Sequence, residues 1–319
     1  MRAVVSILAA LLGFGAVTGT AWALYSGTTS STGNALVASS DWVAPTVSGS
    51  VIAKSQGGVA GYIGQGGSYY AYANATDAGA PASGLVSIAA NLGSLTAGQS
   101  AAPLSPGSFS AGGASYGYRS AALTANATLA AGTYSYALST KDVAGNSRTQ
   151  SGYTVVVDNT APTASDIQTT NKSGNTAGRP EIGDTVIFTF SEPIDPNSIV
   201  AGWTGAATNV VARIANGNPD TLTVWSATNT VQLPLGSVAL GRSEYVSSSA
   251  TFGATGTPSS MVQSGNTITV TLGTASAGPT TALIAGTMTW TPSSSAYDWA
   301  GNPESTAART ESGASDREF

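Results

Sequence analysis

The chain has 319 residues, a net charge of −5 and charged residues at only 8% of positions. Nucleic acid is disfavoured as a partner because phosphate binding requires a basic surface, and the 11 Lys and Arg residues are scattered singly. The absence of His and Cys removes the Ser-His-Asp triad, the Cys-His pair, zinc fingers and disulfides. The length suits two compact units of roughly 110 to 150 residues each.

Residues 1–23 have the three parts of a secretory signal peptide. Arg2 supplies the positive charge, an apolar run follows, and Ala21-Trp22-Ala23 provides the small residues of a cleavage site. The sequence therefore predicts an extracellular or cell-surface location. An uncleaved anchor is the alternative, because the run from Ala3 to Ala23 has about the length that spans a bilayer.

Residues 24–44 are rich in Ser, Thr and Gly, and we expect them to be extended. The stretch AWALYSGTTSSTGNALVAS (Ala21–Ser39) resembles the signal region of the TasA/camelysin-type exported proteins of Gram-positive bacteria, and differs from it at Gly27, where an acidic residue is common. The resemblance implies a bacterial export route. The segment could tether the protein, pair with its own first domain, or assemble the protein by adding a strand to a neighbouring molecule.

Beyond this segment the hydrophobic pattern has a period of two. In GTYSYALSTKD (132–142), Tyr134, Tyr136, Leu138 and Thr140 fall on one face, as a half-buried strand requires. The same pattern occurs in SYYAYANAT, GLVSIAANL, GYTVVVD, DTVIFTF, NVVARIAN, DTLTVWSA, NTITVTLG and TMTWTP. No segment keeps a period of 3.6. The sequence predicts an all-β chain of two β-sandwiches with about seven strands each.

Two repeated motifs divide the chain. DWVAPT (41–46) and DNTAPT (158–163) each contain a proline that suits an extended connector, and KDVAGNS (141–147) and YDWAGNP (297–303) come near the end of each unit. These motifs predict a first domain over 45–158, a second over 159–312 and a polar, disordered tail over 313–319. Asp142 and Asp298 are expected to close hairpins as Asx turns, with the Gly and Asn that follow in left-handed conformations.

The motif-bearing segments resemble bacterial immunoglobulin-like modules. YSYALSTKDVAGNSRTQSGYTVVVDNTAPT (134–163) is similar to the last two strands and exit linker of Ig-like repeats in large bacterial surface proteins. GDTVIFTFSEPIDPNSI (183–199), with YDWAGNP, resembles the S-layer-type Ig-like domain. The resemblance implies two tandem Ig-like β-sandwich domains, and fold alone does not assign an activity.

Carboxylates are the main chemical groups left. Glu192 and Asp195 could form a glycosidase pair, but Asp195 before Pro196 also fits the N-cap of one helical turn. Calcium would suit oxygen ligands at turns, and the candidates are Asp142, Asp298, Asn302, Glu192 and Asp195. No DxDxDG loop is present, and Asx turns account for Asp142 and Asp298 without a metal. We predict no catalytic residue and no cofactor.

Two further groups of residues have both a structural and a functional interpretation. The glycine cluster at 57–67 lacks the Lys-Ser/Thr of a phosphate loop, so we interpret it as a flexible inter-strand loop. The aromatic residues fit a core better than a sugar-stacking surface; they are Trp203, Trp225, Trp290, Trp299, Tyr69, Tyr70 and Tyr72.

The sequence favours a secreted or cell-surface structural module that is not an enzyme. Its expected partners are the cell envelope, other extracellular proteins or glycans. The first alternative is an adhesion or carbohydrate-binding module, which predicts a row of exposed aromatics in a shallow groove. The second is a carboxylate-dependent glycoside hydrolase, which predicts two carboxylates about 5 to 10 Å apart in a deep cleft.

Overall fold

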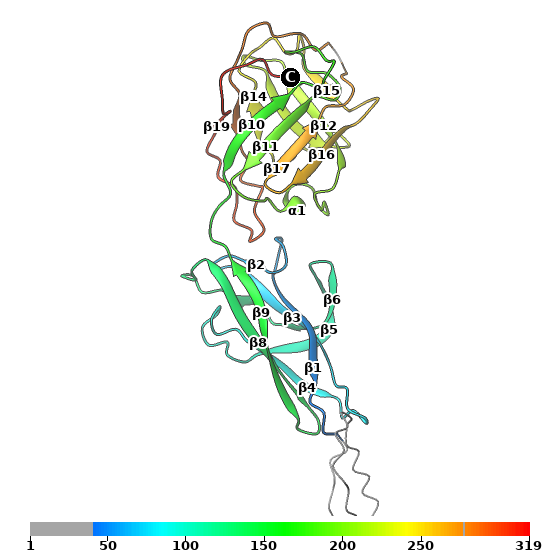
Figure 1. The fold of residues 1–319 in the computed structure, drawn as a ribbon, viewed down its shortest axis with the longest axis vertical. Helices are drawn as coiled ribbons and strands as arrows, with labels where there is room; N and C mark the ends of the chain where they lie inside the picture. Colours follow the sequence, from blue (N-terminus) through cyan, green and yellow to red (C-terminus); the bar gives the residue numbers. More distant parts are fainter. Residues whose placement is uncertain (1–40, 277) are drawn as a thin grey trace, which may run out of the picture. The chain divides into compact units, whose positions relative to one another are not determined.

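The computed structural model describes residues 41–276 and 278–319, which form an all-β structure with two large sheets (Figure 1). The predicted signal peptide (1–23) and residues 24–40 of the extended segment lie outside the described residues. Within the described part, no helix is both long enough and apolar enough to cross a membrane. The all-β prediction is confirmed.

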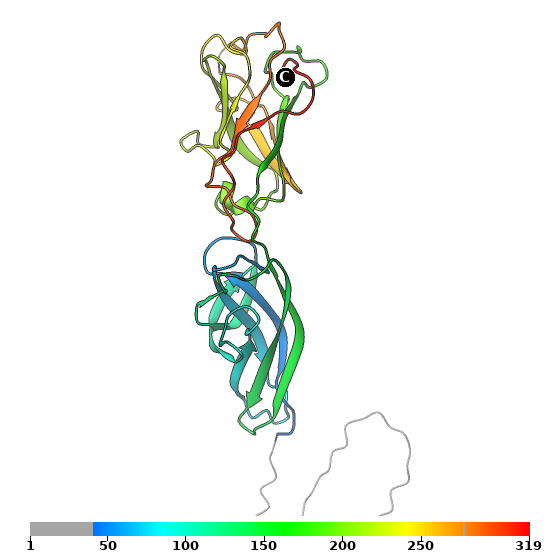
Figure 2. The same ribbon diagram turned by 90° about the vertical axis from the view of Figure 1, so that its left-hand side faces the viewer.

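The first sheet runs in the order β1-β3-β6-β5-β4-β8-β9-β2, with β7 paired to β3. Its strands are β1 Thr46–Lys54, β2 Tyr62–Ile63, β3 Ser68–Thr76, β4 Leu85–Asn91, β5 Ala102–Ala111, β6 Ala114–Ser120, β7 Leu123–Thr124, β8 Gly132–Asp142 and β9 Ser147–Val157. Strands β8 and β9 form a long antiparallel hairpin, green in Figure 2. The start of β5 pairs with β4 and the rest pairs with β6, so the sheet bends along this strand.

The second sheet runs in the order β10-β11-β17-β16-β12-β13-β14-β18-β19, with β15 paired to β12 (Figure 1). Its strands are β10 Ala164–Thr170, β11 Thr185–Phe190, β12 Thr208–Ala215, β13 Thr221–Ser226, β14 Ser237–Ala239, β15 Ala250–Phe252, β16 Ser259–Ser264, β17 Thr267–Thr271, β18 Thr289–Thr291 and β19 Arg309–Thr310. A single helical turn, α1 Pro196–Ile199, follows β11.

Both sheets curl until strands from their two ends are bridged by polar side chains. In the first sheet, the Gln150 side chain of β9 accepts from Val47 N (2.5 Å) and donates to Val47 O (3.0 Å) in β1. In the second, Ser312 N and Oγ each donate to Asp166 of β10 at 2.8 Å. Each half is therefore one continuous, barrel-like sheet.

Each sheet encloses its own hydrophobic core. The first core lies within residues 47–157 and includes Ile52, Tyr69 and Leu138, all fully buried. The second lies within residues 167–319 and is centred on Trp290, whose ring is 5.2 Å from that of Phe188 in an edge-to-face contact. These are the apolar faces that the period-two pattern predicted. The two cores share no residue.

The segment after β19 differs from the predicted disordered tail. Glu318 and Phe319 are 1% and 2% exposed. Gly178 N donates to Phe319 O at 2.7 Å, and the Phe319 ring lies 5.9 Å from that of Tyr245. The segment returns to the second sheet because its apolar last side chain fills a place in the core, which its polar composition does not reveal.

Candidate functional site

Three carboxylates from distant parts of the chain meet at the junction of the two sheets. Asp158 follows β9, Glu192 follows β11, and Asp298 begins the Asp-x-Ala-Gly-Asn turn of the second half. One carboxylate oxygen of each residue lies within 4.8 Å of the other two. Asp298 is 1% exposed, and the other two side chains are half-buried. Glu192 and Asp298 were calcium candidates, whereas Asp158 was not singled out.

The Asp-x-Ala-Gly-Asn turn holds this site together. Asn302 N and Nδ2 donate to the two carboxylate oxygens of Asp298, both at 2.8 Å, and Nδ2 also donates to Asp158 O at 3.0 Å. These bonds use only the N–H groups of Asn302, so its Oδ1, the atom that could bind calcium, takes no part in them. Gly301 takes the left-handed conformation, with φ 81°. Asp298 closes the predicted tight turn, because its N donates to Asn302 O at 3.1 Å, but its side chain bonds the residue four positions on and not the residue two positions on, as an Asx turn would.

The first half repeats the same arrangement. Asn146 N and Nδ2 donate to the two carboxylate oxygens of Asp142 at 2.7 and 2.8 Å, and Nδ2 also donates to Asp41 O at 3.1 Å. Gly145 has φ 97°. Asp142 closes the β8–β9 hairpin as predicted, but its side chain also bonds the residue four positions on and does not form an Asx turn. Asn146, like the Asn of the second turn, does not adopt the predicted positive φ. The turn needs only its glycine in that region, because the Asn side chain already bonds back to the Asp.

The two halves thus carry equivalent acidic triads. Asp41, Asp77 and Asp142 in the first half correspond to the junction triad in the second, and their oxygens also lie within 4.8 Å of one another. In each triad one Asp opens an Ala-Pro-Thr motif, and one begins the Asp-x-Ala-Gly-Asn turn. The sequence contained this signal, since both Ala-Pro-Thr stretches start with Asp. The pairing of the two motifs in space required the fold.

Burial and mutual repulsion change the protonation of the junction triad. Burial raises the pKa of Glu192 to about 7, and the negative charges of Asp158 and Asp298 add to this effect. Burial also raises the pKa of Asp298, against the hydrogen bonds from Asn302. Near neutral pH the triad can therefore hold a proton on Glu192. This proton relieves the repulsion between the carboxylates without requiring a bound cation.

The glycine cluster docks the first half onto this junction. Gly58 N donates to Asp195 Oδ2 at 3.1 Å, and Val59 N donates to Trp299 O at 2.9 Å. Gly58 has φ 76° and approaches Trp299 O so closely that a Cβ would lie 2.8 Å from that oxygen. The predicted inter-strand loop at 57–67 is correct only in part, because β2 (Tyr62–Ile63) lies within it and pairs with β9. Its glycines permit the close approach of the two backbones.

Asp195 has two structural roles. Its Oδ1 accepts from Asn197 N at 3.0 Å and caps α1, whose first residue is Pro196. Its Oδ2 accepts from the loop of the first half. The N-cap prediction is confirmed, and both oxygens accept from backbone N–H groups. Asp195 is not part of any acidic triad among the described residues. Of the five calcium candidates, Glu192 and Asp298 come together, whereas Asp142 lies in the other triad.

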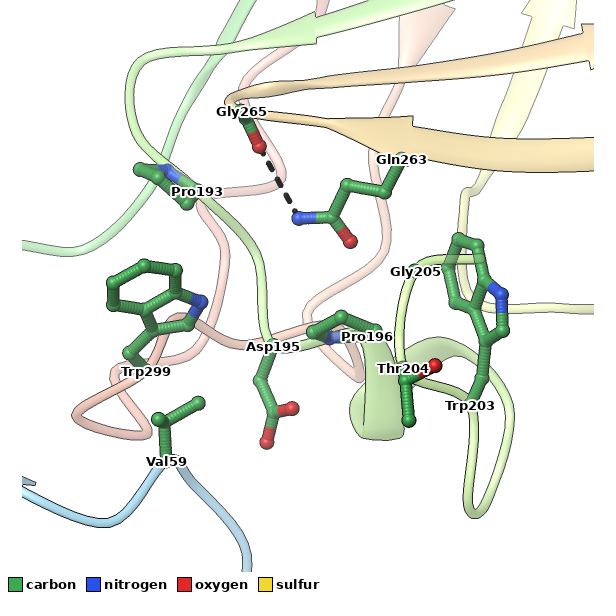
Figure 3. A pocket seen from close by; sticks show the side chains of 10 residues that line it. All are labelled: Val59, Pro193, Asp195, Pro196, Trp203, Thr204, Gly205, Gln263, Gly265 and Trp299. Carbon is green, nitrogen blue, oxygen red and sulfur yellow. Dashed lines mark hydrogen bonds between the residues drawn. The ribbon is translucent and has the colours of Figure 1, made fainter. Parts of the chain in front are cut away.

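A groove of about 520 Å³ lies beside the junction (Figure 3). Trp299 and Trp203 stand at its two ends, with Pro193, Pro196 and Gln263 between them. Trp203 is 8% exposed, and its Nε1 donates to Ala206 O. The Gln263 amide donates to Ile194 O at 2.8 Å, and its Oε1 has no hydrogen-bond partner among the described residues. The aromatics frame the groove rather than forming a row.

Comparison with protein-family models, with curated proteins and with solved structures found no match to this chain.

Proposed function

We propose that the chain is an exported, non-enzymatic structural module of the bacterial cell surface, built from two tandem Ig-like domains. The observation that carries the proposal is the repeated fastening of each Ala-Pro-Thr segment. Asn302 fixes Asp158, and Asn146 fixes Asp41, through the same three hydrogen bonds. Hydrogen bonds that hold the first segment of each half in place suit a chain whose halves keep a fixed orientation.

Three hydrogen bonds support this role for the junction. The bonds Gly58 N to Asp195 Oδ2, Val59 N to Trp299 O and Asn302 Nδ2 to Asp158 O join segments far apart in the sequence. Linkers between domains usually permit relative motion unless the interface restrains it. The separate cores suit two modules, and the contacts suit a stiffened connection between them.

The junction is tested by comparing Asn302→Ala with Asn146→Ala. Both substitutions break the same kind of turn, but only Asn302→Ala releases Asp158 from it. We expect limited proteolysis within residues 158–163 to accelerate in Asn302→Ala and to stay at the wild-type rate in Asn146→Ala. Equal acceleration in both variants, or in neither, would contradict a specific role for the turn at the junction.

The cellular part of the proposal is tested by fractionation of bacteria that express the full chain. The protein is expected outside the cytoplasm, with a mature N-terminus near Leu24. Recovery of the protein from the cytoplasm with residues 1–23 intact would contradict export. Recovery from the membrane with those residues intact would favour the anchor alternative.

An adhesion or carbohydrate-binding module is the second candidate, favoured by the groove. Trp299 offers an aromatic wall on which a sugar ring could stack. Titration with soluble cell-wall oligosaccharides should then show binding that Trp299→Ala abolishes. The hydrolase alternative gains no support, because both oxygens of Asp195, the predicted partner of Glu192, accept from backbone N–H groups and so have structural roles.

A further inference from the structure

A third acidic cluster lies away from the junction, on the segment that returns to the second sheet. Glu311 follows β19, Asp316 pairs with Gly286, and Glu318 lies beside β10. One carboxylate oxygen of each lies within 4.8 Å of the other two. Asp316 is exposed, Glu311 is half-buried, and Glu318 is 1% exposed. The cluster is thus buried at one end and open to solvent at the other.

Two oxygens of this cluster are buried without any hydrogen-bond partner among the described residues. They are Oε1 of Glu311 and Oε1 of Glu318. The other oxygen of Glu318 accepts from Thr169 Oγ1 at 2.7 Å, and the Glu318 carboxyl faces that of Glu311. A buried carboxylate oxygen without a donor is costly, so a native structure that contains one calls for an unseen partner.

No basic side chain neutralises these carboxylates. The ion pairs of the described chain, Arg179–Glu181 and Arg242–Glu244, include none of the three carboxylates. Asp166 adds a further negative charge nearby, and burial together with this crowding raises the pKa of Glu311. Burial raises the pKa of Glu318 as well, and its carboxyl lies within hydrogen-bonding reach of that of Glu311. A proton shared by these two groups is one partner that meets this need, and a metal cation that displaces the proton is the other.

The other two acidic triads differ in this respect. Asp41 accepts from two backbone N–H groups, and Asp142 and Asp298 each accept from the N and Nδ2 groups of an Asn. One oxygen of Asp77 also lacks a partner, but that side chain is half-exposed. Only the Glu311–Asp316–Glu318 cluster combines an almost fully buried carboxylate with an oxygen that lacks a donor, as judged over the described residues.

We propose that Glu311, Asp316 and Glu318 bind one calcium ion. Hard oxygen ligands suit calcium, which binds them at about 2.3 to 2.6 Å and accepts six to eight. Oxygens within 4.8 Å of one another are spaced at about twice that ligand distance. Three carboxylates can supply up to six oxygens, and water can reach the exposed Asp316 side to complete the shell.

The ion would fasten the returning segment to the sheet. Glu311 N donates to Met288 O at 3.2 Å at the start of the segment, and Glu318 N donates to Tyr245 Oη at 3.0 Å near its end. Calcium held between Glu311 and Glu318 would close the segment as a loop across the edge strands β10 and β19. Its expected effect is stabilisation of the second sheet.

The test is a calcium titration of the full chain after removal of metals with a chelator. Binding of calcium chloride is followed by calorimetry and by thermal unfolding, with Glu318→Gln as the first variant. We expect a Kd of about 10⁻⁴ to 10⁻³ M, as in extracellular modules, and at least a tenfold loss of affinity in Glu318→Gln. Calcium at roughly ten times Kd should raise the folded-to-unfolded ratio about tenfold.

Three variants locate the ion. Asp316→Asn changes an exposed residue and should also lower the affinity at least tenfold, so the test does not depend on the folding of Glu318→Gln. Glu192→Gln at the junction and Glu244→Gln in an exposed ion pair should bind calcium as the wild type does. Absence of calcium binding by the wild type at 10⁻² M, or unchanged affinity in both Glu318→Gln and Asp316→Asn, overturns the proposal. Loss of binding in Glu192→Gln alone would place the ion at the junction and overturn it as well.

Discussion

At the scale of single residues, Glu304 is a carboxylic acid buried without compensation. It is 2% exposed, and neither carboxylate oxygen has a hydrogen-bond partner among the described residues. Burial raises the pKa of Glu304 to about 8, from an ordinary value of 4.5. The folded protein therefore holds a proton on Glu304 at neutral pH that the unfolded chain releases.

Glu304 predicts a stability that falls with rising pH. The folded pKa is raised, so the group's contribution to the free energy of unfolding is fully present below pH 4.5 and is lost as the pH rises through about 8. Glu304→Gln cannot ionise. The free energy of unfolding of the variant minus that of the wild type should therefore be more positive at pH 9 than at pH 5. Urea unfolding at both pH values measures this.

The exposed Glu244 provides the control, because Glu244→Gln makes the same chemical change in an exposed ion pair. Its difference from the wild type should be equal at the two pH values. Glu192 has a raised pKa of about 7 and also makes stability fall with rising pH. Because Glu192 is unchanged in the wild type and in both variants, its contribution cancels when they are compared. If the free energies of unfolding of Glu304→Gln and the wild type differed by the same amount at pH 5 and pH 9, Glu304 would not be buried as described.

At the scale of elements, the side-chain bridge between β1 and β9 closes the first sheet. The Gln150 amide takes the place of a peptide group and bonds both Val47 N and Val47 O. Gln150→Ala would leave these two backbone groups without their partner, at a cost of about 1 to 3 kcal/mol in the free energy of unfolding. Amide exchange along β1 should also accelerate, because this end strand would then pair only with β3.

The matched control is Gln232→Ala, since Gln232 is exposed and donates a single hydrogen bond to Gly236 O. This variant should change stability by no more than about 0.5 kcal/mol. A Gln150→Ala protein that matched it in both stability and exchange of β1 would show that the bridge does not close the sheet.

The elements also show how far sequence patterns reach. SYYAYANAT and GTYSYALSTKD coincide with β3 and β8, because alternation and bounding turn residues specify a strand locally. APLSPGSFSA, which forms β5, was missed: it contains two prolines, and its register shifts between Pro106 and Phe109 where the strand bends. The Gln150 bridge joins residues 103 apart in the chain, and no local pattern encodes it.

The candidate site was predictable only in part for the same reason. The turns at Asp142 and Asp298 and the cap at Asp195 are local, so the sequence predicts their positions correctly. The gathering of Asp158 with Glu192 and Asp298 depends on where two strand ends and one turn lie in space. The burial of Glu318 depends on the returning segment, whose composition is that of a solvated tail. Residues of this kind become visible only when the fold is known.

At the scale of the whole molecule, two separate cores and a short connection predict two independently folding halves. One core lies within residues 47–157, the other within 167–319, and the Ala-Pro-Thr connector lies between them. We expect fragments 41–160 and 161–319 to give β-type amide spectra and cooperative thermal unfolding when each is expressed alone. Each half buries a set of large side chains sufficient for its own core, so folding does not require the other half.

The junction contacts predict a measurable difference between the fragments and the intact chain. Separation removes the bonds Gly58 N to Asp195 Oδ2, Val59 N to Trp299 O and Asn302 Nδ2 to Asp158 O. A net loss of about 1 kcal/mol lowers Tm by about 2 to 8 °C for units of this size, so the less stable half should melt earlier as a fragment than within the full chain. Calorimetry of both fragments and of the full chain tests this. Fragments that melted at the temperatures of the intact protein would mean that the junction contacts add no stability, and fragments with random-coil spectra would mean that the two halves fold only as one unit.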